Sequence, residues 1–258
     1  MTRIGLYLFA LLAGACATLV PPPQRARPEA ISPVEAVAAY GRVLERFVDE
    51  RGRVDFAALA RDRHDLDAYV RFVADTPPES FAPGDERLAH YLDSYNALSM
   101  FNVIESGIPQ THAGWRKVVF FALRKFDIGG HSLSLHAYEN DVIRRLGDPR
   151  VHFALNCGAV SCPVLPRRPF AAGDLQQSLD RETRRFFASR DHLRVDSANR
   201  VVHLSEILRF YREDFESSGT SLIGFVNRYV PERIPEDFEI RFISYDWTIA
   251  NVQGHRDP

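Results

Sequence analysis

The segment "DERLAHYLDSYNALSMFNVIESGIP", residues 85–109, predicts the helix around which the rest of the chain folds. Its apolar and aromatic residues occur on almost every side, which is typical of a helix buried on all its faces. Gly107 and Pro109 end it, because glycine suits the helix cap and proline cannot continue a helix. Asn96 and Asn102 lie inside this apolar segment. A buried amide needs hydrogen-bond partners, so each asparagine either ties the helix to a neighbouring backbone or lines a polar pocket.

Helices are predicted before this segment, and helices and strands follow it in an irregular order. Ser32, Pro33 and Glu35 form a capping-box start for a helix within residues 32–50, and residues 64–78 read as a second helix. The elements expected after the central helix are a hairpin turning at Gly129–Gly130, a helix from Ser134 to Gly147, a strand over residues 150–157, a helix over 173–189, a hairpin turning at 197–199, two short helices within 205–231 and a strand over 238–247. This order predicts an α+β fold: a single helix-rich domain over residues 33–258 with a small, mainly antiparallel sheet.

The N-terminal segment resembles an export leader. Arg3 precedes an uncharged run from Ile4 to Val20, which predicts a signal peptide over residues 1–15. "LLAGAC" resembles a lipobox, so Cys16 is the expected lipidation site, with plain cleavage after Ala15 as the alternative. The Pro-rich residues 16–32 then form a tether. We therefore expect an extracytoplasmic protein on the periplasmic side of a bacterial membrane, anchored through the lipid on Cys16 or secreted.

The composition is that of an ordinary globular protein. The chain has 258 residues, of which 45% are hydrophobic and 26% charged. Its 32 basic residues are scattered and the formal net charge is −2, which argues against a nucleic-acid partner. No motif predicts a cofactor, and the pair His131 and His136 alone is too little for a metal site.

"RVHFALNCGAVSCPVLP", residues 150–166, holds the two cysteines outside the leader. In an oxidising compartment Cys157 and Cys162 are expected to form a disulfide, but one of them could instead be a nucleophilic thiol. If residues 150–157 form a regular strand, His152 and Cys157 point to opposite sides, which weakens a simple dyad between them but leaves Cys162 open.

A carboxylate and two amides complete the set of candidate site residues. Glu139 falls on the apolar stripe of the helix after Ser134, so it must be paired with an arginine, hydrogen-bonded or protonated. Its functional interpretation is a general acid or base, or a group that orients His152. Asn96 and Asn156 are the other candidates for that orienting role.

Several segments together resemble a known family, the domain of unknown function 547, in an envelope-type bacterial member. They cover most of residues 88–251 in the family's order: "DSYNALSMFNVI", "FDIGGHSLSLHAYENDVIRRL", "DPRVHFALNCGAVSCPVL", "LSEILRFYREDF" and "YDWTIAN". Two segments depart from the pattern that the resemblance implies. "DSYNA" replaces the usual "NAYNA", and Asn140 stands where a histidine is common. The resemblance implies a fold but no reaction.

Two functions are consistent with these residues. The first is a cysteine-dependent hydrolase or acyl transferase, with Cys157 or Cys162 as nucleophile, His152 as base, and Glu139 or Asn96 orienting it. The second is a non-catalytic envelope lipoprotein that binds an envelope protein or a small molecule, with Cys157 and Cys162 joined in a structural disulfide.

Overall fold

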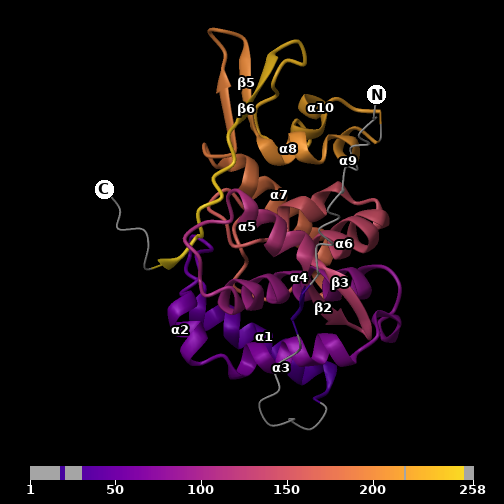
Figure 1. The fold of residues 1–258 in the computed structure, drawn as a ribbon. Helices are drawn as coiled ribbons and strands as arrows, with labels where there is room; N and C mark the ends of the chain where they lie inside the picture. Colours follow the sequence, from indigo (N-terminus) through magenta and orange to yellow (C-terminus); the bar gives the residue numbers. More distant parts are fainter. Residues whose placement is uncertain (1–17, 21–30, 218, 253–258) are drawn as a thin grey trace, which may run out of the picture.

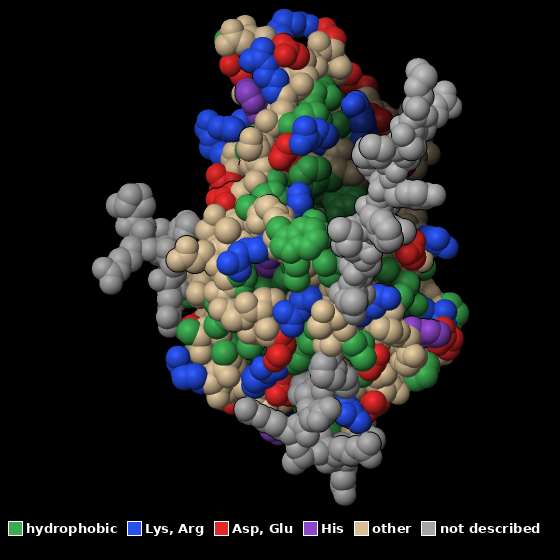
Figure 2. All heavy atoms as spheres, in the orientation of Figure 1, with side chains coloured by type: hydrophobic (Ala, Val, Ile, Leu, Met, Phe, Trp, Pro, Cys, Tyr) green, Lys and Arg blue, Asp and Glu red, His purple; other side chains and the backbone are tan. Residues whose placement is uncertain are grey.

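The computed structural model describes residues 18–20, 31–217 and 219–252. Its helices and two small three-stranded sheets confirm the α+β class. Helices α1 to α4 form one end of the molecule, and the sheet that contains β5 and β6 forms the other end, beside α8 to α10 (Figure 1). Hydrophobic side chains gather on the visible face between these two ends, with basic side chains scattered around them (Figure 2). In the part of the chain that is described, no helix is both long enough and apolar enough to cross a membrane.

The central helix α4 (Asp85–Glu105) is buried over most of its length, as predicted. It packs on the helices of the N-terminal half in one large hydrophobic core. The capping box of α1 is present, because Glu35 N–H donates to Ser32 Oγ and Ser32 N–H donates to Glu35 Oε2. The N-terminal helices are α1 (Pro33–Phe47), α2 (Phe56–Arg61) and α3 (His64–Asp75), followed by the 3-10 turn Pro78–Ser80.

The first sheet contains the predicted Gly–Gly hairpin. Strand β2 (Arg124–Ile128) pairs antiparallel with β3 (His131–Ser134), and the turn Gly129–Gly130 has positive φ at both residues. A short strand β1 (Thr18–Leu19) pairs parallel with β2, so part of the predicted tether lies in the sheet. The predicted signal peptide and Cys16 lie outside the described residues.

The segments around this hairpin are wound irregularly. Ser134 caps the following helix, as predicted, and Gly147 ends it with a φ of 79°. Between them the winding changes from α-helical to π-helical to 3-10. The elements before and after the hairpin are α5 (Trp115–Val118), the π-helical turn η2 (Val119–Leu123), α6 (Leu135–Ala137), the π-helical turn η3 (Tyr138–Ile143) and the 3-10 turn η4 (Arg144–Leu146).

The predicted strand over residues 150–157 is wrong. The structure has a 3-10 helix η5 (Pro149–Phe153), followed by irregular chain. Asp148 caps it by accepting a hydrogen bond from Arg150 N–H, and Pro149 occupies its first turn. These two residues are a local helix-start signal, which outweighs the apolar run that follows them.

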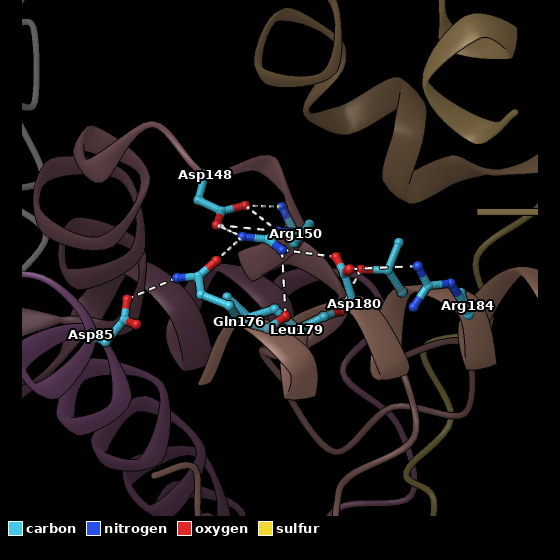
Figure 3. Close-up of polar contacts among 8 residues, drawn as sticks. Asp85, Asp148, Arg150, Gln176, Leu179, Asp180 and Arg184 are labelled. Carbon is cyan, nitrogen blue, oxygen red and sulfur yellow. Dashed lines mark hydrogen bonds and ion pairs between the residues drawn. The ribbon is translucent and has the colours of Figure 1, made fainter. Parts of the chain in front are cut away.

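Arg150 anchors this 3-10 helix to its neighbours (Figure 3). Its guanidinium donates to Asp148 and, across to the next helix, to Asp180 at 2.8 Å and to Gln176. Gln176 in turn donates to Asp85 at the start of α4, at 2.8 Å. The network therefore fixes the segment that carries His152 against two helices. The helices that follow are the 3-10 turn Ala172–Asp174 and α7 (Leu175–Ala188).

The strands form two mixed sheets rather than one mainly antiparallel sheet. In the second sheet the hairpin pair β4–β5 is antiparallel, as predicted, but β6 pairs parallel with β5 because three short helices connect them. A second hydrophobic core lies against this sheet. The elements here are β4 (Leu193–Asp196), β5 (Val201–Ser205), α8 (Glu206–Phe210), α9 (Arg212–Glu216), α10 (Leu222–Val226) and β6 (Glu239–Ile243).

Candidate active site

A narrow pocket of about 60 Å³ brings together residues from both halves of the chain. It holds four of the five residues predicted for a catalytic site: Glu139, His152, Cys157 and Cys162. The fifth, Asn96, does not line it. The complete lining is Tyr95, Phe121, Glu139, His152, Leu155, Cys157, Cys162, Pro163, Ile207, Phe210, Tyr211, Tyr245 and Trp247.

The two cysteines are free, so the predicted disulfide is absent from the structure. Their sulfur atoms are 2.8 Å apart, well beyond the roughly 2.05 Å of a disulfide bond. Cys162 Sγ also accepts hydrogen bonds from the Cys157 backbone N–H and from the Tyr245 hydroxyl, both at 3.1 Å. The Cys157 thiol supplies the third hydrogen bond, so three donors surround one sulfur atom.

The unequal hydrogen bonding shifts the pKa values of the two thiols in opposite directions. Burial alone would raise the pKa of Cys162, but its hydrogen bonds with Cys157 and Tyr245 outweigh burial and lower that pKa below its ordinary value. The hydrogen bond to Cys162, together with burial, raises the pKa of Cys157. Cys162 is therefore the thiol that ionises more readily, and Cys157 stays protonated as its donor.

Asparagines hold the cysteine loop in shape. Asn156 Nδ2 donates to the Pro163 carbonyl at 2.7 Å, and Asn156 Oδ1 accepts from Gly158 N–H at 2.7 Å. Asn96 Oδ1 accepts from Asn156 N–H at 2.8 Å, while its Nδ2 donates to the Ala154 carbonyl at 2.9 Å. Asn96 thus ties the central helix to a neighbouring backbone. It positions the loop and does not touch the pocket.

The chain after β6 covers the loop and brings in Tyr245. Two backbone hydrogen bonds join the segments, from Val160 N–H to the Thr248 carbonyl at 2.8 Å and from Ala250 N–H to the Gly158 carbonyl at 2.7 Å. Trp247 packs on Tyr245 with ring centroids 4.3 Å apart. Tyr245 therefore reaches Cys162 only because the C-terminal segment crosses back over the first core.

His152 is paired with a carboxylate from α9. Its Nε2 lies 2.7 Å from Asp214 Oδ2, and its ring stacks on Tyr211 with centroids 3.9 Å apart. Burial would raise the pKa of Asp214, but hydrogen bonds from His152 and Arg144 outweigh burial and hold that pKa well below its usual range. An ionised carboxylate can only accept, so His152 Nε2 carries the proton. Its Nδ1 has no hydrogen-bond partner among the described residues.

Glu139 lies near this free nitrogen and is bonded to tyrosine rather than to arginine. Its Oε1 is 4.0 Å from His152 Nδ1, and its Oε2 accepts from the Tyr95 hydroxyl at 3.0 Å. Burial and the Glu139 charge raise the pKa of both Tyr95 and Tyr211, which keeps these phenols protonated as donors. The pairing with arginine considered for Glu139 is therefore absent.

Asn140 lies beside the site but outside the pocket. Its Oδ1 accepts from Arg144, which also binds Asp214 through two hydrogen bonds at 2.7 and 2.8 Å. Its Nδ2 donates to the His136 carbonyl at 2.8 Å. Asn140 therefore supports Arg144, which holds Asp214, and it does not line the pocket.

Sequence reasoning missed Tyr211, Asp214, Tyr245 and Trp247. All four lie in segments that carried the family resemblance, "LSEILRFYREDF" and "YDWTIAN". The polar and aromatic residues of these two segments were the available signal. Among the residues that the structure describes, no group of three or more His, Cys, Asp or Glu could hold a metal ion. The arrangement offers a thiol with a lowered pKa and an imidazole–carboxylate pair.

The comparisons with known proteins give one family and no function. No curated protein and no solved structure matches the chain. The matching family model covers residues 79–187, which include Glu139, His152 and both cysteines but not Asp214 or Tyr245. Over this segment the chain is similar to the family described as "Protein of unknown function, DUF547".

Proposed function

We propose that the protein is a cysteine-dependent hydrolase or acyl transferase that uses Cys162 as its nucleophile. The convergence of three hydrogen-bond donors on Cys162 Sγ, in a pocket that also holds His152, carries this proposal. Such hydrogen bonds stabilise a thiolate, which is the reactive form of cysteine. The free nitrogen of His152 and its pairing with Asp214 supply the acid–base group and its orienting partner.

The reaction has two steps. The Cys162 thiol proton passes to the free Nδ1 of His152, and the thiolate attacks a carbonyl carbon, so an S–C bond forms while the bond to the leaving group breaks. The leaving group takes that electron pair and a proton from the imidazolium of His152. Water or another acceptor then gives a proton to His152 and attacks the thioester, which breaks the S–C bond and restores the thiolate.

Acylation of the sulfur by a simple ester tests this proposal. The protein is reduced, mixed with p-nitrophenyl acetate, and digested so that mass spectrometry locates the acetyl group. We expect acetyl on Cys162 in the wild type and in Cys157→Ala, at a slower rate in the variant because the thiol donor is removed. Cys162→Ser should lose the fast phase of p-nitrophenolate release. Acetyl found on Cys157 alone, or on neither cysteine, would refute the assignment.

Ligand binding without catalysis is a second candidate, supported by a larger pocket. This pocket, of about 420 Å³, shares Cys162 and Pro163 with the first and is also lined by Arg53 and His192. Its volume falls within the range of small-molecule sites. If neither sulfur of the native, reduced protein reacts with iodoacetamide while both react after unfolding, the binding function is favoured over thiol catalysis.

We also propose that the protein works outside the cytoplasm, attached to the membrane through a lipid on Cys16. The leader-like sequence of residues 1–16 supports this. Cys16→Ser should move the protein from the membrane fraction to the soluble fraction in a bacterial host. Unchanged membrane retention would contradict lipid anchoring.

A further inference from the structure

The pocket that holds Cys162 and His152 is small and lined mostly by apolar side chains. Its volume of about 60 Å³ is less than half of the roughly 150 Å³ of an apolar protein cavity that binds benzene. The space therefore suits a group of two to four heavy atoms. Its apolar walls include Phe121, Leu155, Ile207, Phe210 and Trp247.

We propose that the site accepts short apolar acyl groups, such as acetyl and propionyl, and that Phe210 sets this limit. The proposal rests on the function proposed above and names its substrate class. A carbonyl carbon placed at Cys162 Sγ leaves the acyl chain in this pocket, which holds His152, and not in the pocket of about 420 Å³, which shares Cys162 but lacks His152. A longer acyl chain would then have to extend past Phe210.

Phe210 is the residue at the mouth. It is 42% exposed, whereas the other lining residues are buried or half-buried. Its ring stacks on Trp247 with centroids 6.3 Å apart and an interplanar angle of 26°. It also packs on Tyr245 at 5.8 Å, so it closes the pocket on the side that faces solvent.

The rest of the wall is packed against other residues on several sides. Trp247 packs on Tyr245, lies 6.1 Å from Phe121 and carries Lys117 Nζ over its ring at 4.5 Å. Leu155 and Ile207 belong to the two hydrophobic cores. Expanding these walls would disturb packing in both cores, so removing the Phe210 ring is the simplest way to enlarge the site.

Chain-length selectivity tests the proposal. Initial rates of Cys162 acylation are measured with p-nitrophenyl acetate, butyrate and octanoate, each divided by its rate with free dithiothreitol to correct for intrinsic reactivity. One misfit methylene in an enzyme pocket changes rates by about 10- to 200-fold, so acetate should exceed octanoate by at least ~100-fold in the wild type. In Phe210→Ala the butyrate-to-acetate ratio should rise about 10-fold.

Trp115→Ala is the matched control, since Trp115 is an aromatic residue that is 68% exposed and does not line the pocket. It should leave the butyrate-to-acetate ratio unchanged. Equal corrected rates for acetate and octanoate in the wild type, or an unchanged ratio in Phe210→Ala, would overturn the size limit alone. Reaction of Cys162 with iodoacetamide but with no ester would overturn the proposed function instead.

Discussion

Replacing Asn96 by alanine tests whether one side chain in the central helix holds the cysteine loop. Asn96 is 1% exposed, and its amide satisfies two buried backbone groups, the Ala154 carbonyl and the Asn156 N–H. Alanine would leave both without partners. Asn102 offers a matched comparison, because it lies buried in the same helix and satisfies one backbone group, the Phe120 carbonyl at 3.0 Å.

The number of orphaned groups sets the expected loss. A buried backbone donor or acceptor without a partner costs about 1–3 kcal/mol, so Asn96→Ala should lower the free energy of unfolding by about 2–6 kcal/mol and Asn102→Ala by about 1–3 kcal/mol. Both variants gain the same helix propensity and lose the same side-chain volume. The difference between them therefore reports the second hydrogen bond.

Equilibrium unfolding in urea measures the two free energies. The rate of Cys162 alkylation by iodoacetamide in the folded protein reports whether the cysteine loop keeps its conformation. We expect Asn96→Ala also to change the alkylation rate of Cys162, because Asn156 no longer fixes the loop, while Asn102→Ala leaves that rate unchanged. Equal destabilisation by the two variants, together with an unaltered Cys162 rate in both, would refute the positioning role of Asn96.

Three further changes have defined outcomes. Burial raises the pKa of Asp93, so its folded pKa exceeds the unfolded value of about 4. The stability of the wild type therefore falls as pH rises above that value. Asp93→Asn should reduce this slope and be more stable than the wild type at pH 8, as measured by unfolding in urea. The folded pKa of Asp214 is depressed, so the stability that its carboxylate contributes is present above the unfolded pKa and is lost as pH falls. Asp214→Asn should therefore lose less stability on acidification than the wild type. An identical dependence of stability on pH in the two proteins would contradict this. Gly52 has a φ of +75° and no room for a Cβ, so Gly52→Ala should cost at least about 1–2 kcal/mol in thermal unfolding, whereas Gly173→Ala, at an open position with ordinary φ, should cost almost nothing.

Signals within a few residues predicted much of the secondary structure. The capping box at Ser32, the hairpin at Gly129–Gly130 and the helix end at Gly147 are all present. Each depends on the types of a few consecutive residues, which can be read directly from the sequence. The apolar run at residues 150–157 was ambiguous, because periodicity does not separate a short buried strand from a buried helical turn. The cap formed by Asp148 and Pro149 was the local signal that decided it.

The candidate site was predicted in part. Burial of polar groups in apolar segments singled out Glu139, His152 and the cysteines, and the structure places all four on one pocket. Their partners Asp214 and Tyr245 lie 62 and 83 residues away along the chain from His152 and Cys162. No local pattern encodes such contacts, since the segments are distant in the sequence and meet only in the folded chain.

The sequence by itself determined the helix-rich α+β class, the central buried helix and the residue types available for thiol chemistry, because turn chemistry and hydrophobic pattern act over short distances. The tertiary structure alone decided which of the two thiols has the lowered pKa. That choice depends on a tyrosine from the last segment of the fold, a backbone N–H in the loop and the exclusion of water around both thiols. Hydrogen bonding and desolvation at a single atom are set by its neighbours in space, and the order of residues in the chain does not specify them.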